Sequence, residues 1–264
     1  MIVRQRGVTV IELIASLAII SLVAAGLAQL MAGQLRHVAH QEAMVERRQE
    51  GRAVVALLLR ELRLAGFPAT PDPLCHVMTG GIDVSPSSVR FLANLHGVAT
   101  VFAGPAAAGD TVLSIPDNNR IRAGGLTVSP GALFEANDVI YLHDRGVIDD
   151  PGDDRVECHR LDRGGRSGRI ELAAGDWLRG TFPAGSRIQV VNLVRYAHAP
   201  ETHQLVRSVD GAAQAVADHV AAADFTLQEG RVAAQLVMEP RPTVTGPTVA
   251  GAVWPLLVTP RNHE

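Results

Sequence analysis

The apolar segment near the N-terminus constrains the fold most. From Val8 to Leu35 the chain contains one charged residue, Glu12, and the next charge is Arg36. An α-helix of roughly 20 apolar residues crosses the hydrocarbon core of a bilayer, so this segment is long enough to span a membrane. Two arginines precede it, and the positive-inside tendency then places the N-terminus in the cytoplasm and the chain after Arg36 outside.

Three kinds of N-terminal segment fit this pattern. A secretory signal would end at a small-residue cleavage site such as Val23-Ala24-Ala25, but the apolar run continues past it. A simple single-pass anchor explains the length, yet an acidic side chain in a membrane helix costs about 3 kcal/mol on insertion scales and by default has a function. The third kind is a segment in which Glu12 has a partner.

The residues Gly7-Val8-Thr9-Val10-Ile11-Glu12 resemble the processing site of the type IV prepilin family, which includes pilins, minor pilins and the pseudopilins of type II secretion. In that family a membrane peptidase cuts after the glycine, the new N-terminus is methylated, and a glutamate nearby pairs with a neighbouring subunit's terminal amine. The resemblance implies cleavage after Gly7, a new N-terminus at Val8 and Glu12 as the pairing carboxylate. Phenylalanine usually stands where this chain has Val8, which leaves N-methylation there open.

Such a pairing selects the register of assembly. A carboxylate and an ammonium attract strongly away from water, but an unpaired partner is penalised more than the pair is rewarded. A neighbouring helix that docks out of step would therefore leave Glu12 unpaired in lipid. The implied partners are other pilin or pseudopilin subunits, the prepilin peptidase and the inner membrane, which the chain would cross once with its C-terminal domain in the periplasm.

Charge and composition exclude several functions. Residues 1–66 contain 8 Arg and 5 Glu, and residues 67–264 contain 16 Arg and 22 acidic residues, so neither part offers the strongly basic surface that nucleic acids require. All 24 basic residues are arginine, which excludes a Walker A lysine and a Schiff-base lysine. A Gly-x-Ser-x-Gly nucleophile motif is missing, because the last glycine of Gly165-Arg166-Ser167-Gly168 is out of register. We expect no enzyme activity and no cofactor or metal.

Cys75 and Cys158 are the only cysteines, and both lie in the part expected outside the cytoplasm. An even number of cysteines in an oxidising compartment favours one disulfide, with two unconnected buried thiols as the alternative. His76 and His159 follow the two cysteines, but this spacing matches no zinc module. The acidic run 149–154 offers oxygens that Ca²⁺ accepts but lacks EF-hand spacing, so we interpret it as a solvated loop.

The helix is expected to continue beyond the membrane, over residues 8–66. The chain contains no proline before Pro68, and the segment after Arg36 is rich in strong helix formers. Gly66-Phe67-Pro68 provides the expected end. One stripe of this helix should pack on the following domain: Met44, Gly51, Val55, Leu58, Leu62 and Ala65. An acidic row, one residue per turn, either faces solvent or meets arginines of a neighbouring subunit: Glu42, Glu46 and Glu50.

From Pro68 onward the pattern changes to short apolar runs between turn residues, which is typical of antiparallel strands. One short helix is expected at residues 212–223, and residues 240–264 should be irregular, with Trp254 anchoring them. We therefore expect a pilin-like α+β chain: a leader (1–7), a long helix (8–66, with 8–35 spanning the membrane) and a β-rich domain (67–264) whose antiparallel sheet packs on the outer half of the helix. The expected strands are residues 89–95, 111–115, 139–143, 156–161, 169–172, 187–194, 204–209 and 231–238.

A narrower resemblance concerns the segments Asn192-Leu193-Val194-Arg195-Tyr196, Gln204-Leu205-Val206-Arg207 and Val216-Ala217-Asp218-His219-Val220, with Phe225 after them. In J-type minor pseudopilins and W-type minor pilins, a strand ending in tyrosine, a strand ending in arginine and a short helix occur in this order. This resemblance implies a minor subunit of a type IV pilus or a type II secretion pseudopilus, or of the tip complex that starts one. Because Glu12 is retained, we expect a position away from the extreme tip.

The alternative is a membrane-tethered periplasmic enzyme or binding protein whose site residues the sequence does not reveal. Substitution of Gly7 or Glu12 would distinguish the two hypotheses, since it would disturb the assembly of a fibre subunit and leave a tethered enzyme unaffected. A mature chain that begins at Val8 favours the first hypothesis, and one that begins at Met1 or Gly26 excludes it.

Overall fold

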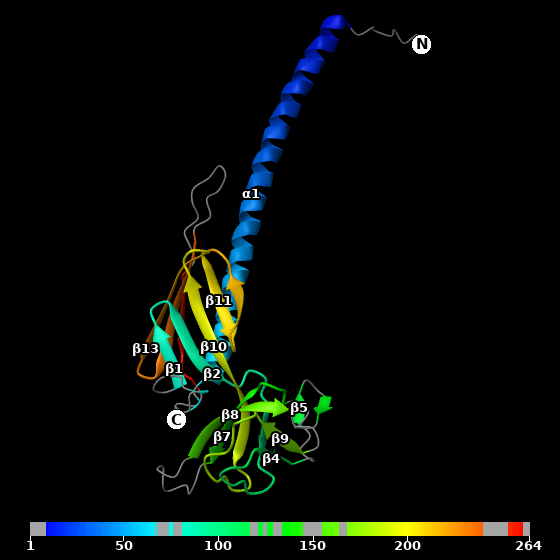
Figure 1. Cartoon of the computed structure of the whole chain (residues 1–264). Helices are drawn as coiled ribbons and strands as arrows, with labels where there is room; N and C mark the ends of the chain where they lie inside the picture. The colour runs from blue at the N-terminus through cyan, green and yellow to red at the C-terminus, as the bar shows by residue number, and fades with distance from the viewer. Residues whose placement is uncertain are drawn as a thin grey trace. The chain divides into compact units, whose positions relative to one another are not determined.

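The computed structural model has a long N-terminal helix followed by antiparallel β-sheets, which is the α+β class expected from the sequence (Figure 1). Helix α1 (Val10–Leu64) is 55 residues long. The chain divides into two compact units, and α1 contributes residues to both. One unit comprises Met1–Glu50 and Pro242–Thr248, and the other comprises Gly51–Arg241 and Val249–Glu264. The structure describes residues 9–65, 67, 74–75, 81–116, 121–123, 126–128, 134–144, 155–163, 168–239 and 253–260. Pro68 and the acidic run 149–154 lie outside these residues.

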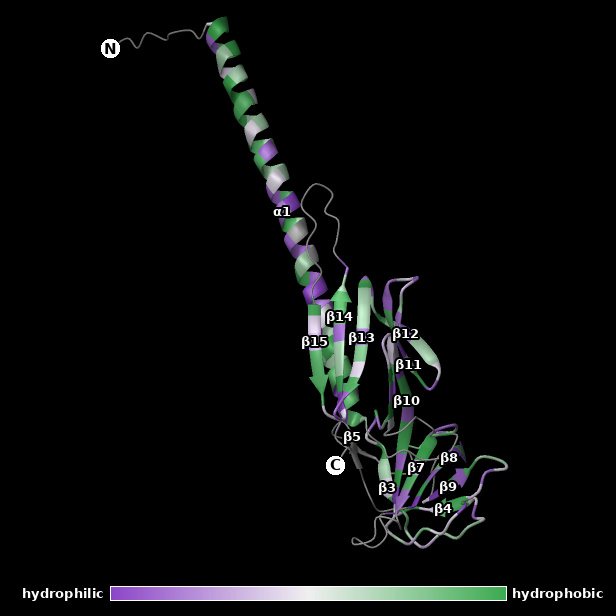
Figure 2. Ribbon diagram, turned by 90° about the vertical axis from the view of Figure 1, so that its left-hand side faces the viewer, coloured by the Kyte–Doolittle hydropathy of each residue, from purple (hydrophilic) through white to green (hydrophobic). Residues whose placement is uncertain are grey.

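In the first unit, α1 exposes large apolar side chains from Val10 to Leu35. Figure 2 shows this part of the helix mainly in the colour of hydrophobic residues, with more polar ones after it. Among the described residues, α1 is the one helix long and apolar enough to cross a membrane, by length and composition. An apolar surface of this extent is consistent with a single-pass membrane anchor.

The second unit contains a large antiparallel sheet built around β10 (Arg187–Ala199). The first half of β10, through Val191, pairs with β3 and β7, and the second half, from Asn192, pairs with β2 and β11. One long strand therefore belongs to two parts of the sheet. The other strands of this sheet are β1 (Ile82–Ser85), β2 (Ser88–Ala93), β3 (Ala99–Val101), β4 (Val112–Ser114), β7 (Val139–Asp144), β8 (Arg155–Arg163), β9 (Arg169–Leu172), β11 (Gln204–Val209) and β12 (Ala212–Ala217).

Two smaller sheets complete the fold. One has three strands, β13 (Val220–Gln228), β14 (Arg231–Met238) and β15 (Val253–Val258), and the other pairs β5 (Ile121–Ala123) with β6 (Leu126–Val128).

The last turns of α1 pack on strands of both larger sheets in one hydrophobic core. Leu58, Leu62 and Ala65 are buried there, as the apolar stripe of the helix predicted. Val54 is buried where the sequence suggested Val55, which is only partly covered. The strand residues of this core include Phe91, Val194, Tyr196, Leu205, Phe225 and Val232.

A second core lies among the strands between β2 and β10 in the sequence, and includes Phe102, Leu113, Phe182 and Ile188. A third, smaller cluster contains Phe67, Tyr141 and the two cysteines. Cys75 and Cys158 form a disulfide bond across 83 positions of the sequence. The bond ties the segment that follows α1 to β8.

The predicted helix at residues 212–223 is wrong. These residues form β12 and the start of β13, which pair with β11 and β14. Alanine-rich sequence favours helix in isolation, but strand pairing overrides this weak preference. Of the three elements in the narrower resemblance to J-type and W-type subunits, the short helix is thus absent from the described residues, while Tyr196 and Arg207 lie within strands that continue to Ala199 and Val209.

The prediction of an irregular C-terminal segment is wrong at residues 253–258, which form β15. Trp254 packs against the core of the second unit, so its expected anchoring role holds within this strand. Strands β1, β3, β5 and β6, each three or four residues long, were not among those expected either.

Candidate functional site

The first candidate residue, Glu12, lies in the first turn of α1. Its carboxylate accepts hydrogen bonds from the backbone N–H and the hydroxyl of Thr9, both at 3.0 Å, and its own N–H donates to Thr9 Oγ1 at 3.3 Å. This reciprocal arrangement is a capping box, which satisfies two donors that a helix N-terminus otherwise leaves free. We expect the Glu12 carboxylate to pair with the amine of a neighbouring subunit. In the single chain it is instead hydrogen-bonded to Thr9 at the N-terminus of its own helix. Gly7 and Val8 lie outside the described residues.

The second candidate site joins α1 to the large sheet at Glu61. Arg207 on β11 donates to both carboxylate oxygens of Glu61, from Nη2 at 2.6 Å and from Nε at 2.9 Å. Tyr196 on β10 donates its hydroxyl to Glu61 Oε2 at 2.6 Å. The carboxylate therefore accepts three hydrogen bonds from two strands, and it is satisfied although it is buried.

The surroundings raise the pKa of both hydrogen-bond donors in this cluster on balance. Burial of the Tyr196 ring and its hydrogen bond to Glu61 raise the pKa of the phenol, so Tyr196 remains a hydrogen-bond donor. The hydrogen bond to Glu61 also raises the pKa of Arg207. The side chain of Glu61 is 6% exposed and that of Arg207 is 21% exposed, so a broken pair would leave a nearly buried charge. The cluster fixes the position of the end of α1 on the sheet.

The sequence indicated two of these three residues, but not the third. Tyr196 and Arg207 are the strand-ending residues of the narrower resemblance, where they had no assigned contact. Glu61 was missed, although it stands between Leu58 and Leu62 on the apolar side of the helix. An acid on the core-facing stripe of an amphipathic helix is the signal that would have predicted a buried partner.

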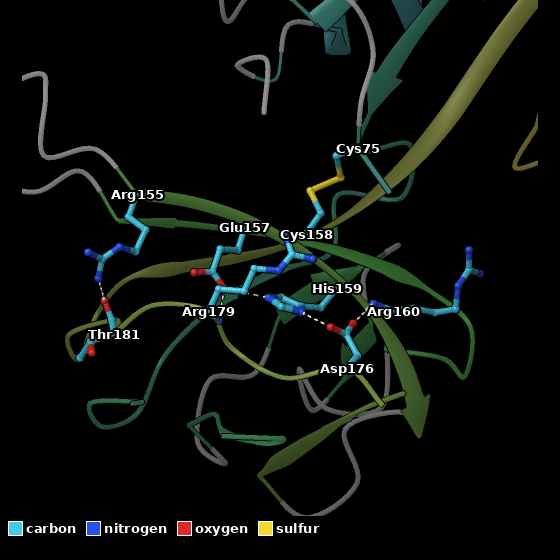
Figure 3. A network of polar contacts seen from close by, with 9 residues as sticks. All are labelled: Cys75, Arg155, Glu157, Cys158, His159, Arg160, Asp176, Arg179 and Thr181. Carbon is cyan, nitrogen blue, oxygen red and sulfur yellow. Dashed lines mark hydrogen bonds and ion pairs between the residues drawn. A yellow bond between two sulfur atoms is a disulfide. The ribbon is translucent and has the colours of Figure 1, made fainter. Parts of the chain in front are cut away.

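A third polar cluster surrounds His159 on β8, next to the disulfide (Figure 3). His159 is fully buried, with Nε2 at 3.0 Å from Glu157 Oε2 and Nδ1 at 2.9 Å from Asp176 Oδ1. The backbone N–H of Arg179 donates to Glu157 at 2.9 Å, and that of Arg160 donates to Asp176 at 3.2 Å. The cluster therefore joins β8 to the loop that contains Asp176 and Arg179.

Each ring nitrogen of His159 faces a carboxylate oxygen. Burial alone would lower the pKa of His159, but the hydrogen bonds and negative charges of Glu157 and Asp176 outweigh it and raise the pKa. Burial alone would have the opposite effect on an acid and raise the pKa of Glu157. The hydrogen bonds that Glu157 accepts from His159 and from the Arg179 N–H outweigh this effect and lower its pKa. The protonated ring donates to both carboxylates, so the cluster acts as a structural ion triad.

The cysteine and histidine pairs do not form a metal centre. Both cysteine sulfurs are in the disulfide, so neither is a thiolate ligand, and His76 lies outside the described residues. Within the described part of the chain, no group of three or more His, Cys, Asp and Glu residues has an arrangement that could hold a metal ion.

Residues 2–28 match the family model described as the prokaryotic N-terminal methylation motif. No curated protein and no solved structure matches the chain. The matched motif covers the predicted cleavage site and the beginning of α1, and it points to a structural subunit rather than to an enzyme. The chain therefore combines the N-terminal motif of a type IV pilin-like precursor with an apolar helix long enough to cross a membrane and a β-rich part.

Proposed function

We propose that this protein is a minor pilin or pseudopilin, a structural subunit of a type IV pilus or of a type II secretion pseudopilus. The prepilin peptidase cuts it after Gly7, and Val8 becomes the N-terminus of the mature chain. Helix α1 then holds the subunit in the inner membrane, with the β-rich part in the periplasm, until helix packing brings it into the fibre or the tip complex that starts one. The single observation that supports this most is the methylation motif on residues 2–28, continuous with a 55-residue helix.

In the assembled fibre, Glu12 pairs with the freed amine of a neighbouring subunit. The capping box with Thr9 gives the carboxylate hydrogen bonds before that partner arrives, which lowers the cost of holding an acid in lipid. Exchange of the cap for a neighbour's ammonium then replaces neutral donors by a cation, which adds the attraction between opposite charges that is strong away from water. Retention of Glu12 supports a position away from the extreme tip.

The assignment to the W-type or J-type minor class is supported by Tyr196 and Arg207. In the structure these residues have a shared role, because both bind Glu61 and so seat α1 on the sheet. The strand structure of residues 212–223 argues against a full match to either class.

The test is the mass of the mature N-terminus together with two substitutions. We expect a chain that begins at Val8, with or without a methyl group, and loss of that cleavage in Gly7→Val. Glu12→Gln should still be cut but should enter fibres poorly, whereas Glu201→Gln, an exposed acid of the β-rich part, should behave as wild type. An uncut chain in membranes, or normal fibres from Glu12→Gln, would contradict the proposal.

A further inference from the structure

Strand β12 is an outer strand of the large sheet. It pairs with β11 on one side, and among the described residues no strand pairs with its other side (Figure 2). Residues 212–215, which form its first part, are all exposed. In an antiparallel pair, alternate residues direct both N–H and C=O toward the same neighbour, so every second residue of β12 directs these groups away from the sheet.

Natural proteins protect the outer strands of their sheets, and this protein does so elsewhere. Very short strands, charges, proline and covering segments prevent pairing with another chain. Strands β1, β3, β4, β5 and β6 are three or four residues long. β15 has Pro255 in its middle, while β13 contains Asp224 and donates the N–H of Phe225 to the carbonyl of Pro86 at 3.0 Å. These strands are therefore poor templates for a further strand.

The first four residues of β12 lack these protections. The strand has the sequence Ala-Ala-Gln-Ala-Val-Ala, without a charged residue, a proline or a glycine. Its register with β11 is regular over residues 212–215 and shifts only after Ala215. At 3.4 Å per residue, this gives an open edge of about 14 Å with about four backbone groups to satisfy.

The open edge is suited to one kind of partner. Its side chains are three methyl groups and one amide, which give a partner's side chains little to recognise. Its backbone groups are complementary to those of another extended chain, and strand addition of this kind uses main-chain hydrogen bonds for affinity. Because this edge carries no charge, a charged residue in the added strand would find no ionic partner on β12. The partner is therefore an extended segment with uncharged side chains.

A different protein fits this edge better than a second copy does. Two copies of β12 could pair only through the same residues on each, and such an isologous contact closes a dimer. Both open edges would then be occupied, and neither copy could use its edge to join another subunit. A minor subunit stands among subunits of other kinds, so the segment that reaches β12 comes from one of them.

We propose that residues 212–215 of β12 receive an extended, uncharged segment of a different subunit of the fibre, which adds one strand to the large sheet. The inference rests on the proposed function, because that function places this chain beside other subunits. About four main-chain hydrogen bonds, each of modest net strength, are too few to hold two free proteins together. In the fibre the membrane helices already hold the subunits side by side, and a second contact between linked partners gains from their high effective concentration. Assembly therefore closes the open edge.

Hydrogen exchange tests this directly. The full chain is prepared alone in detergent and within fibres isolated from cells that assemble them, and residue-resolved mass spectrometry follows the amides of residues 212–215. The outward amides are those of either Ala212 and Gln214 or Ala213 and Ala215. We expect them to exchange at least tenfold more slowly in the fibre, and to slow more than the two amides that donate to β11. Unchanged exchange of the outward amides would contradict the inference, and so would equal slowing of all four, which indicates general shielding.

Ala213→Pro and Gln214→Pro are a matched pair of variants. Because neighbouring residues alternate, one proline removes an N–H bonded to β11 and the other removes an outward N–H. Urea titration of the detergent-solubilised chain distinguishes them, since the first should lower the urea midpoint more than the second. The second should be cut after Gly7 as the wild type is, but should enter fibres at least threefold less. Normal incorporation of this variant would overturn the inference, and if both prolines unfold the chain, hydrogen exchange of the wild type decides.

The outcomes separate this inference from the proposed function. If the chain is cut and assembled but the exchange of β12 is unchanged, the added strand is wrong and the fibre subunit remains. If the chain is neither cut nor assembled, the proposed function fails, and the inference fails with it. Gln214→Cys in two differently tagged copies detects the other occupant: a disulfide between the two tags in the fibre would show that β12 pairs with a second copy, and would overturn the assignment to a different subunit.

Discussion

Glu61 of α1 and Arg207 of β11 form a two-pronged ion pair although they are 146 positions apart in the sequence. The bidentate geometry fixes the orientation of both side chains, and Tyr196 adds a third hydrogen bond to the same carboxylate. Because Glu61 follows Leu58 on the core-facing side of the helix, a rotation or slip of α1 would break the pair. The ion pair therefore selects one register of the helix on the sheet.

Substitution of Arg207 tests this role. In Arg207→Leu, Tyr196 is the one partner that Glu61 keeps among the described residues, and loss of one member of a buried pair costs about 3 kcal/mol of the free energy of unfolding. The triple variant Glu61→Leu, Arg207→Leu, Tyr196→Phe removes all three polar groups and should recover most of that loss, since apolar replacements of buried pairs are often neutral. Urea titration of the detergent-solubilised full chain, followed by circular dichroism, measures both. Equal stability of Arg207→Leu and wild type would show that the pair does not hold the helix.

The ion triad around His159 predicts a limited range of pH for full stability. The raised pKa of His159 stabilises the fold below the unfolded value of about 6.5, and this contribution is lost as the pH rises through the folded pKa. The lowered pKa of Glu157 stabilises the fold above the unfolded value of about 4.3, and this contribution is lost as the pH falls through the folded pKa. Both contributions are complete only between these two unfolded values.

We therefore expect the urea midpoint of the wild-type protein to decrease when the pH is raised above this range and when it is lowered below it. His159→Gln keeps a side chain of similar length without the titrating ring. Its urea midpoint should be lower than that of the wild type near pH 5.5, which lies within the range, and should change less than that of the wild type between about pH 5.5 and about pH 9, which lies well above the range. His96→Gln, which alters an exposed histidine outside the triad, is the control. A wild-type midpoint that stays constant from pH 5.5 to 9 would exclude the triad as a source of stability.

The disulfide between Cys75 and Cys158 closes a long loop. In the chain-entropy model, a loop of 83 positions gives a stabilisation of roughly 4 kcal/mol by restricting the unfolded chain. Reduction, or the pair Cys75→Ser and Cys158→Ser, should lower the free energy of unfolding by up to that amount, with Cys158→Ser alone costing as much because the bond is lost either way. Urea titration with and without dithiothreitol measures the difference. If the free energy of unfolding differed by less than about 1 kcal/mol, the unfolded chain would already be compact over this loop, and the disulfide would restrict it little.

The long helix and most of the longer strands follow from the sequence, because their signals are local. An apolar run without proline predicts α1, and alternating apolar residues predict β7, β8, β9, β10, β11 and β14. Glu12 and the cleavage site were also indicated by a local motif. The contacts of Tyr196 and Arg207 with Glu61 were not, since they join residues far apart and no local pattern encodes which strand meets the helix.

The false helix at residues 212–223 has a specific cause. Asp210-Gly211 connects β11 to β12, and Glu229-Gly230 connects β13 to β14, with positive φ at all four residues. Such two-residue connections match the twist of a hairpin, and Asp-Gly is among the strongest hairpin signals in a sequence. The prediction gave more weight to the helix preference of the alanines in β12 than to this turn. The turn chemistry, together with pairing to β11, determines the structure there.

Gly51 of α1 makes room for the indole of Trp254. A Cβ atom at this position would lie 2.6 Å from Trp254 Nε1, a distance that requires something to move. In a helix exposed to solvent, Gly→Ala stabilises by about 1 kcal/mol, but overpacking of a core contact costs about 1–3 kcal/mol. We therefore expect Gly51→Ala to lower the free energy of unfolding of this protein.

The effect of Gly51→Ala on the free energy of unfolding should change sign when Trp254 is replaced by a smaller residue. In Trp254→Phe the smaller ring leaves room for a methyl group, and the loss of Nε1 costs no hydrogen bond to the described residues, since that buried nitrogen makes none. Gly51→Ala should then be stabilising in the Trp254→Phe background, and the double-mutant cycle should give a coupling above about 1 kcal/mol. Gly33→Ala, where nothing lies within 4 Å of the new atom, is the control and should have the same effect on stability in both backgrounds. Additive effects of the two substitutions would show that Gly51 does not seat Trp254, because the methyl group and the indole would then occupy separate space.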